Sequence, residues 1–294
     1  MGRLVDSYDS FVFDFYGTLV DIWTDEEDER LWRTMAGIYA CYGADYSAAE
    51  FKAAYKKAVA AAEAALKEKT GAELPEIELG SIFIELLMDA PKAHPALIGA
   101  AGRIEDGAGS FSYETRNAAE RIGGAEHWSE MQKSAFAAGI ANTFRVVSRK
   151  RFGAYKNTVS TLSALKKAGK KLYLLSNAQG VFTVPEIEQA GVYGLLDDMF
   201  ISSEQGMKKP EAAFLLKLME KHRLDPSRTA MVGNDVAADM GIAALCGTGG
   251  ILLNTDGLTD EETARRIKKM QAATRTQFTP VVVKSGDIAE ILQM

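Results

Sequence analysis

The sequence predicts an α/β fold, a Rossmann-like doubly wound parallel sheet core that carries an inserted all-helical domain. From Lys156 onward, short apolar segments of strand character alternate with helical patterns, which is typical of a parallel sheet covered by helices on both faces. One more strand, at 11–13, stands apart, and the apolar residues that follow it recur at helical spacing. We therefore predict a discontinuous core domain at 1–21 and 151–294, and a helical cap domain at 22–150.

The first predicted strand ends on an acid. Asp14 follows the apolar run 11–13, and Gly17 lets the backbone turn sharply three residues later. Ligands of open α/β sheets bind outside the carboxyl ends of the strands, so this position suits a reacting group. The alternative is that Asp14 only caps the next turn, as many acids do.

The predicted insert shows helical signals alone. Two capping boxes, Thr24 with Glu27 and Ser47 with Glu50, are expected to open helices. The basic residues at 149–151 suit the negative end of the last helix. We predict no strand in this part of the chain.

Polar residues accompany the later strands, which we expect at 171–175, 199–202, 229–232, 250–253 and 280–283. Ser176 ends one strand, Lys209 opens a helix, and Asp235 and Asp239 follow another strand. In a doubly wound sheet all of them would face one crevice together with Asp14. An aspartate can form a covalent intermediate and a lysine can neutralise charge on a transferring group. Facing carboxylates would repel unless a hard cation such as Mg²⁺ lay between them.

The composition bounds the class of protein. Of the 294 residues 47% are hydrophobic, enough for a sizeable core, and 40 acidic side chains against 34 Lys and Arg give a net charge of −6. This balance argues against nonspecific nucleic-acid or anionic-membrane partners. Cys41 and Cys246 suit reduced thiols, residues 1–10 contain no apolar leader, and no run approaches the ~18 apolar residues of a membrane span. We expect a cytoplasmic protein, and the oligomeric state stays open.

The four polar segments, in this order, resemble the haloacid dehalogenase superfamily of aspartyl-enzyme hydrolases, which includes many phosphatases. The resemblance covers residues 9–21 and about 155–254, and the insert is similar to the cap that many members carry at that point. It implies Asp14 as the nucleophile, Thr18 as the hydroxyl that orients it, and Lys209 as the group that stabilises negative charge.

The resemblance also implies binding sites. Ser176, with the main chain at Asn177, would hold anionic oxygens of the substrate. A Mg²⁺ ion would be bound by oxygen donors: Asp14, the main-chain oxygen of Tyr16, Asp235 and Asp239.

Two residues depart from the phosphatase pattern. Tyr16 stands where these enzymes usually have a second acid, which protonates the leaving alkoxide and activates water. With an unperturbed pKa of about 10, a tyrosine would be a poor base near neutral pH. The fourth segment reads Gly-Asn-Asp at 233–235 instead of Gly-Asp, so either Asp235 or Asp239 could bind the metal.

The segment at 14–19, Asp-Phe-Tyr-Gly-Thr-Leu, looks like the first motif of the 2-haloacid dehalogenases of the family. A halide leaves without a proton, so that chemistry needs no second acid. Leu-Trp-Arg at 31–33 resembles the segment with their cap arginine. Arg33 is therefore a candidate substrate-binding residue, as is Tyr16. Those metal-free enzymes have a Ser- and Asn-rich fourth motif, whereas this chain keeps Asp235 and Asp239.

Our hypothesis from the sequence is a hydrolase that acts through Asp14, as a Mg²⁺-dependent phosphatase of a small phosphorylated metabolite. The first alternative is a metal-independent 2-haloacid dehalogenase-type hydrolase. The second is a non-catalytic ligand-binding or regulatory protein, in which Tyr16 stands in place of the second acid because catalysis has been lost.

Overall fold

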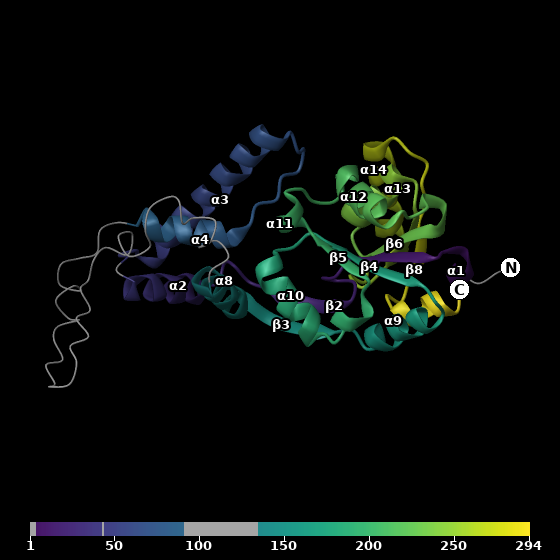
Figure 1. Ribbon diagram of the computed structural model, residues 1–294, viewed down its shortest axis with the longest axis horizontal. Helices are drawn as coiled ribbons and strands as arrows, with labels where there is room; N and C mark the ends of the chain where they lie inside the picture. Colours follow the sequence, from purple (N-terminus) through teal and green to yellow (C-terminus); the bar gives the residue numbers. More distant parts are fainter. Residues whose placement is uncertain (1–3, 43, 91–134) are drawn as a thin grey trace, which may run out of the picture. The chain divides into compact units, whose positions relative to one another are not determined.

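The computed structural model describes residues 4–42, 44–90 and 135–294, and the chain forms two compact units (Figure 1). The core unit comprises Met1–Trp23, Ala65–Ile77 and Lys150–Met294. The insert unit comprises Thr24–Ala64 and Glu78–Arg149. Residues 91–134 of the predicted cap domain lie outside the described residues, and residues 65–77, which that prediction included, group with the core unit.

A six-stranded parallel sheet forms the centre of the core unit, in the order β5-β4-β1-β6-β7-β8. The strands are β1 (Ser10–Phe13), β4 (Lys171–Ser176), β5 (Asp198–Ile201), β6 (Thr229–Gly233), β7 (Gly249–Leu253) and β8 (Val281–Val283). Phe13 pairs with Leu174 of β4 on one side and with Val232 of β6 on the other. The carboxyl end of β1 therefore lies where the strand order reverses, which is where ligands bind in such sheets.

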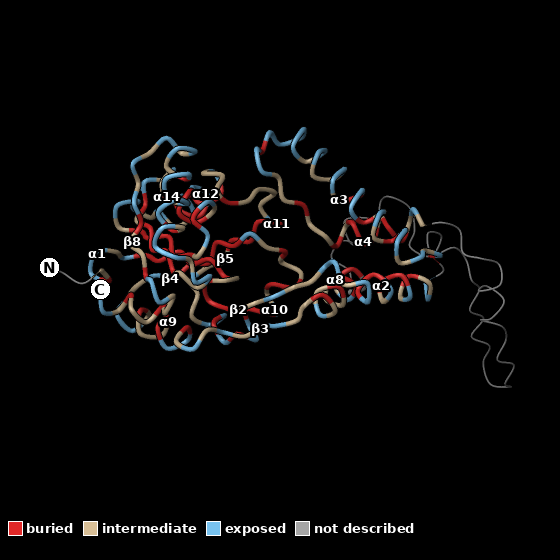
Figure 2. The backbone as a smooth tube through the Cα atoms, turned by 180° about the vertical axis from the view of Figure 1, so that it is seen from behind, coloured by how far each residue is buried: buried red, intermediate tan, exposed pale blue. Residues whose placement is uncertain are grey.

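Helices cover both faces of the sheet, because successive side chains of each buried strand point to opposite faces. Phe11 and Phe13 pack on one face with α9 (Thr158–Lys167) and η5 (Ile288–Leu292). Val12 packs on the other face, where α12 (Ala212–His222) and α13 (Gly241–Cys246) supply the partners, and α14 (Asp260–Thr274) lies beside them (Figure 1). Buried backbone runs along the central strands (Figure 2). The predicted fold class is confirmed.

Shorter elements connect these layers. They are α1 (Leu4–Ser7), α10 (Gly180–Gln189), η2 (Tyr193–Leu195), α11 (Ser202–Gln205), η3 (Pro226–Arg228) and the π-helix η4 (Val236–Met240). None of the described helices is long and apolar enough to cross a lipid bilayer.

The insert unit is built from α2 (Glu29–Cys41), α4 (Leu79–Met88), α8 (Ala135–Ser148) and most of α3 (Ala48–Thr70). An aromatic cluster forms its core, in which Trp32 lies 5.7 Å from Phe144 and Tyr55 lies 5.8 Å from Phe83 between ring centroids. The predicted capping box before α3 is confirmed, since the Ser47 N–H donates to Glu50 and the Glu50 N–H donates to Ser47.

Two predictions at the borders of the insert were wrong. Val20–Thr24 and Arg149–Ala154 form strands β2 and β3, which pair in a second, two-stranded sheet. Residues 149–151 are therefore strand residues, and Thr24 ends β2 instead of capping a helix. Asp28 caps α2, accepting the N–H of Arg30 at 2.8 Å. The strands were missed because they lack an apolar alternation and depend on pairing between distant segments, reinforced by an ion pair from Arg151 to Asp21.

Candidate active site

Asp14 occupies the central position of the site. Its N–H donates to the carbonyl of Val232 at 2.9 Å, which continues the β1–β6 ladder by one residue, and the residue is 8% exposed. Oδ1 accepts hydrogen bonds from Ser176 Oγ at 3.1 Å and from Lys209 Nζ at 2.7 Å. Oδ2 receives a longer contact of 3.4 Å from Thr18 Oγ1. The structure thus brings four residues from three separate segments together, as the sequence predicted for one crevice.

Lys209 is a buried cation between two carboxylates. Its Nζ lies 2.7 Å from Asp14 Oδ1, 2.7 Å from Asp239 Oδ1 and 2.8 Å from the carbonyl oxygen of Leu175, and the residue is 4% exposed. Burial alone would lower the pKa of Lys209, but the charges of Asp14 and Asp239 outweigh it and raise that pKa. The ammonium therefore stays charged and pairs with both acids.

Asn177 holds the main chain of Lys209 in place. The Lys209 N–H donates to Asn177 Oδ1 at 2.7 Å, and Asn177 Nδ2 donates to the Lys209 carbonyl at 3.0 Å. A side-chain amide that bonds both main-chain groups of one residue fixes where that residue lies. The Asn177 side chain is thus a positioning group for Lys209, whereas the substrate-binding role of its main chain stays a prediction.

Asp239 is the second buried acid of the site, with no exposed surface. Its Oδ1 pairs with Lys209 and its Oδ2 accepts the main-chain N–H of Asp235 at 2.9 Å. Burial raises the pKa of the Asp239 carboxyl, although the Lys209 ammonium pulls it down. The carboxylate lies against Gly233, where a Cβ atom would come within 2.1 Å of Oδ2, so only glycine fits at the end of β6.

Asp235 is exposed and caps the π-helix η4. Its Oδ1 accepts the N–H groups of Ala237 at 2.7 Å and Ala238 at 3.0 Å. The two predicted acids of this segment are therefore neighbours after β6, but Asp235 is exposed to solvent whereas Asp239 is buried.

Thr18 contacts the fourth segment as well as Asp14. Its Oγ1 donates to Asn234 Oδ1 at 3.2 Å, the shorter of its two contacts. Gly17 makes this approach possible, since it has a φ of 78° and a Cβ atom there would lie 2.5 Å from the Asn234 amide. Asn234 was read from the sequence only as a departure from a pattern, and its structural partner could not be seen there.

The side chain of Tyr16 bonds to helix α10. Its hydroxyl donates to Glu186 Oε2 at 2.5 Å and lies 2.9 Å from Thr183 Oγ1. Glu186 is 3% exposed and Thr183 is fully buried. The sequence did not single out either residue, because a lone acid and a lone threonine within a helix give no signal until their partner is known.

Carboxylate oxygens, the ligands that a hard cation such as Mg²⁺ prefers, are contributed to this site by Asp14 and Asp239, which share the Lys209 ammonium. Both oxygens of Asp239 are engaged by Lys209 and Asp235, and Oδ1 of Asp14 is engaged by Lys209, whereas Oδ2 of Asp14 has the long Thr18 contact. Within the described residues no group of three or more His, Cys, Asp or Glu side chains is placed to hold a metal ion. Among these carboxylate oxygens, Oδ2 of Asp14 has the weakest protein contact and is therefore the one best able to bind a cation.

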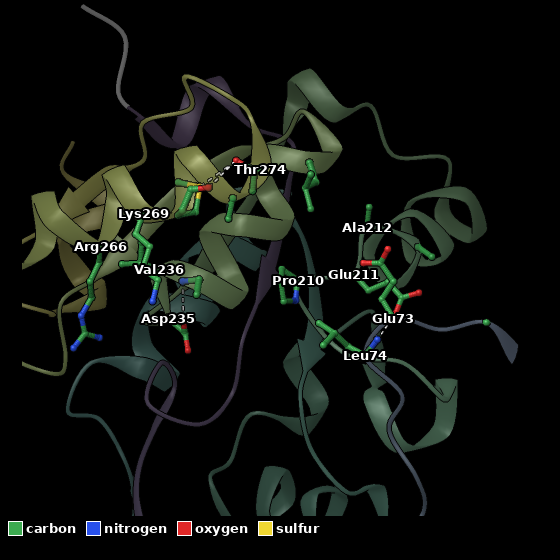
Figure 3. Close-up of a pocket in the computed structure, with 16 residues that line it drawn as sticks. Glu73, Leu74, Pro210, Glu211, Ala212, Asp235, Val236, Arg266, Lys269 and Thr274 are labelled. Atoms are coloured by element: carbon green, nitrogen blue, oxygen red, sulfur yellow. Dashed lines mark hydrogen bonds between the residues drawn. The ribbon is translucent and has the colours of Figure 1, made fainter. Parts of the chain in front are cut away.

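A cavity of about 920 Å³ lies in the core unit beside Asp235 (Figure 3). Arg266 and Lys269 of α14 line one part of it, and Glu73 and Glu211 line another. Of the residues predicted for the site, Asp235 lines this cavity, whereas Asp14, Ser176 and Lys209 do not. The cavity therefore shares Asp235 with the predicted site and is otherwise lined by other residues.

Arg33 is an exposed residue of α2 in the insert unit. Its predicted contact with the substrate stays a prediction.

Part of the chain is similar in sequence to known phosphatases. The chain is 31% identical over 108 residues to a glyceraldehyde 3-phosphate phosphatase of Methanothermobacter thermautotrophicus, which covers 37% of this chain and 47% of that protein. It is 34% identical over 87 residues to a phosphoglycolate phosphatase of Vibrio vulnificus, which covers 29% of this chain and 38% of that protein. The similarity thus spans less than half the length of each phosphatase.

Among solved structures, a dehalogenase matches with a TM-score of 0.50 and 16% identity, over 98% of this chain and 97% of that one. At this identity the likeness concerns the fold alone. The family model described as "haloacid dehalogenase-like hydrolase" matches residues 8–247, from the residues before β1 to the end of α13. The chain belongs to the haloacid dehalogenase-like hydrolase family.

Proposed function

We propose that this protein is a phosphatase that hydrolyses a small phosphorylated metabolite through a covalent intermediate on Asp14. The observation that carries the proposal is a carboxylate at the end of the central strand that is oriented by Ser176 and Lys209 and stays 8% exposed. The partial similarity to two named phosphatases supports the same class.

Asp14 would attack the phosphorus atom and displace the leaving group, and water would then hydrolyse the aspartyl phosphate. Lys209 would stabilise the negative charge that develops on the transferring group, and its contacts with Asp14, Asp239 and the Leu175 carbonyl hold it in position. Ser176 would turn its hydroxyl from Asp14 toward a substrate oxygen, and the main chain at Asn177 would provide a second donor. Thr18 would keep the carboxylate oriented.

We further propose that the site binds Mg²⁺ through Asp14, the main-chain oxygen of Tyr16 and Asp235. Asp239 fits this role less well, since both of its oxygens already have partners. When bound, the ion would supply positive charge to the phosphoryl oxygens. The insert unit would act as the cap, with Arg33 as a candidate contact for the substrate.

The test is phosphate release from a panel of phosphorylated metabolites in Mg²⁺ buffer, with and without EDTA. Asp14→Asn keeps the shape of the side chain and removes the nucleophile, so turnover should fall at least about 10³-fold. Asp260→Asn is the matched control, because Asp260 is an exposed acid paired with Lys284. Full activity of Asp14→Asn would refute the proposal.

The second candidate is a hydrolase of carbon–halogen bonds, which Tyr16 favours by standing in place of a second acid. Such an enzyme would release halide from a 2-haloacid in the presence of EDTA. Single turnover in ¹⁸O water separates the two candidates. Water that attacks phosphorus labels the phosphate, whereas water that attacks an Asp14 ester labels the enzyme.

A further inference from the structure

The hydroxyl hydrogen of Tyr16 has a defined position. A phenol has one hydrogen, and the 2.5 Å bond to Glu186 Oε2 uses it. The Thr183 hydroxyl, 2.9 Å away, must then donate to the phenol oxygen. Tyr16 therefore donates toward α10 and not toward a substrate.

This bond is difficult to exchange for one with a substrate. Glu186 is 3% exposed and Thr183 is fully buried, so a phenol that turned away would give up two buried hydrogen bonds. Bonds to a carboxylate are also the stronger and shorter class of hydrogen bond. The orientation of the hydroxyl is thus a stable property of the core unit.

The side chains that contact Asp14 also direct their polar hydrogens to oxygen atoms of the protein. Nζ of Lys209 has three hydrogens and three oxygens within 2.8 Å: those of Asp14, Asp239 and the carbonyl of Leu175. Ser176 donates to Asp14, and in the proposed reaction it donates to a phosphoryl oxygen instead, so its hydrogen is not given to the leaving group. In the described part of the core unit, the side chains that contact Asp14 thus direct their polar hydrogens to protein oxygens.

A leaving group that must take up a proton as it departs would find no donor among them. An alkoxide is about as basic as hydroxide, and it departs poorly without a proton. A carboxylate or a phenolate, with parent pKa values of about 4 and 10, departs far more easily.

We infer that this site is specific for phosphorylated substrates with acidic leaving groups, namely acyl and aryl phosphates, over phosphate esters of simple alcohols. The inference rests on the proposed phosphatase function. With an acyl phosphate, the bond from Asp14 to phosphorus forms as the bond from phosphorus to the acyl oxygen breaks, and the electron pair leaves on the carboxylate. Water then attacks phosphorus, the Asp14 carboxylate leaves in turn, and both protons of the water end on phosphate or in solvent.

The second step, hydrolysis of the aspartyl phosphate, also has a leaving group that departs without a proton. Its leaving group is the carboxylate of Asp14, which needs no proton. Transfer through a loose, metaphosphate-like transition state asks little of a base for the attacking water. Both steps can therefore proceed in a site whose side chains give no proton to the leaving group.

The experiment compares acetyl phosphate, 4-nitrophenyl phosphate, phenyl phosphate and ethyl phosphate with the full-length protein in Mg²⁺ buffer. We expect kcat/KM to fall steeply as the leaving group becomes more basic, with ethyl phosphate at least about 10³-fold below acetyl phosphate. This factor is at the middle of what a positioned acid contributes. Equal rates along the series would overturn the inference. Phosphate release from none of the four would instead refute the phosphatase function, and the inference with it.

Variants at Tyr16 and at its two partners test whether the direction of the Tyr16 hydroxyl causes this preference. The measured quantity is kcat/KM for ethyl phosphate divided by kcat/KM for acetyl phosphate. Tyr16→Asp supplies a carboxyl that can hold a proton, so this ratio should rise at least about 10-fold. Glu186→Gln keeps the size of the side chain, and its amide can donate to the phenol oxygen. The hydroxyl hydrogen of Tyr16 is then released, so this variant should also raise the ratio. Thr183→Val removes the other partner of the Tyr16 hydroxyl but leaves its bond to Glu186, so this variant should not raise the ratio. A selective loss of ethyl phosphate turnover in Tyr16→Phe would show that the phenol is a proton donor and would contradict the inference.

Discussion

Lys209 offers the sharpest test of how the site is held together. Replacing it with methionine keeps an unbranched side chain that is one atom shorter, and removes the charge that separates Asp14 from Asp239. Both acids are buried, at 8% and 0% exposure, and each lies 2.7 Å from the ammonium. Removing one partner of a buried ion pair typically costs about 3–5 kcal/mol, because the remaining charge has no compensation. We expect Lys209→Met to lose free energy of unfolding in this range at neutral pH.

The loss should depend on pH in a defined direction. Burial already raises the pKa of Asp239, and without Lys209 it rises further. A carboxyl whose pKa is raised in the folded state binds its proton more readily there than in the unfolded chain. The penalty on folding is absent below the unfolded pKa of about 3.9, grows between that value and the folded pKa, and is complete above the folded pKa. The variant should therefore be closest to the wild type in mild acid and furthest from it above neutral pH.

Urea unfolding at pH 5.5 and pH 8 measures both effects. Lys208→Met is the matched control, since Lys208 is a half-buried neighbour with a 3.2 Å ion pair to Glu76, and it should lose less than about 1 kcal/mol. Lys209→Met combined with Asp239→Asn should recover part of the loss, because the buried charge is then removed with its partner. If Lys209→Met were as stable as the control at pH 8, or less stable at pH 5.5 than at pH 8, the ion-pair reasoning would be refuted.

Other residues of the site give predictions of comparable sharpness. Gly233→Ala places a Cβ atom 2.1 Å from the Asp239 carboxylate, so we expect about 1–3 kcal/mol of destabilisation in thermal unfolding together with lower turnover. Asn177→Ala removes both bonds that hold the main chain of Lys209, and steady-state kinetics should show kcat reduced about 10²-fold. Asp235→Asn should raise the Mg²⁺ concentration for half-maximal activity at least about 10-fold, and more than Asp239→Asn does, in a metal titration after EDTA treatment.

Features that depend on local pattern could be predicted from the sequence. The strands β4, β6 and β7 are apolar runs that end in Ser176, Gly233 and Leu253, and each is observed within a residue or two of its predicted bounds. The rule that ligands bind at the carboxyl ends of parallel strands then placed Asp14, Ser176, Lys209 and Asp239 together, and the hydrogen bonds among them agree with that placement.

Features that depend on distant partners could not be predicted. The main chain at Asn177 was expected to contact the substrate, which stays a prediction, whereas the bonds of its side chain to Lys209, far along the chain, gave no signal in the sequence. Glu186 gave no signal, because a buried acid in a helix looks like an exposed one until the phenol of Tyr16 is placed against it. Strand β3 was read as a helix end, because its charged residues are stabilised by pairing with β2 and not by burial of an apolar face.

The charges of the site connect the metal proposal to the choice of substrate. Asp14 and Asp239 face one ammonium, that of Lys209, so the buried cluster carries one negative charge in excess when both acids are ionised. A phosphate dianion would add two more within a few ångströms, at an effective dielectric constant far below that of water. A phosphatase built on these residues therefore requires a further cation, whereas a haloacid with its single charge imposes a smaller demand. Phosphate release that persisted in EDTA would contradict this charge argument even if Asp14 proved to be the nucleophile.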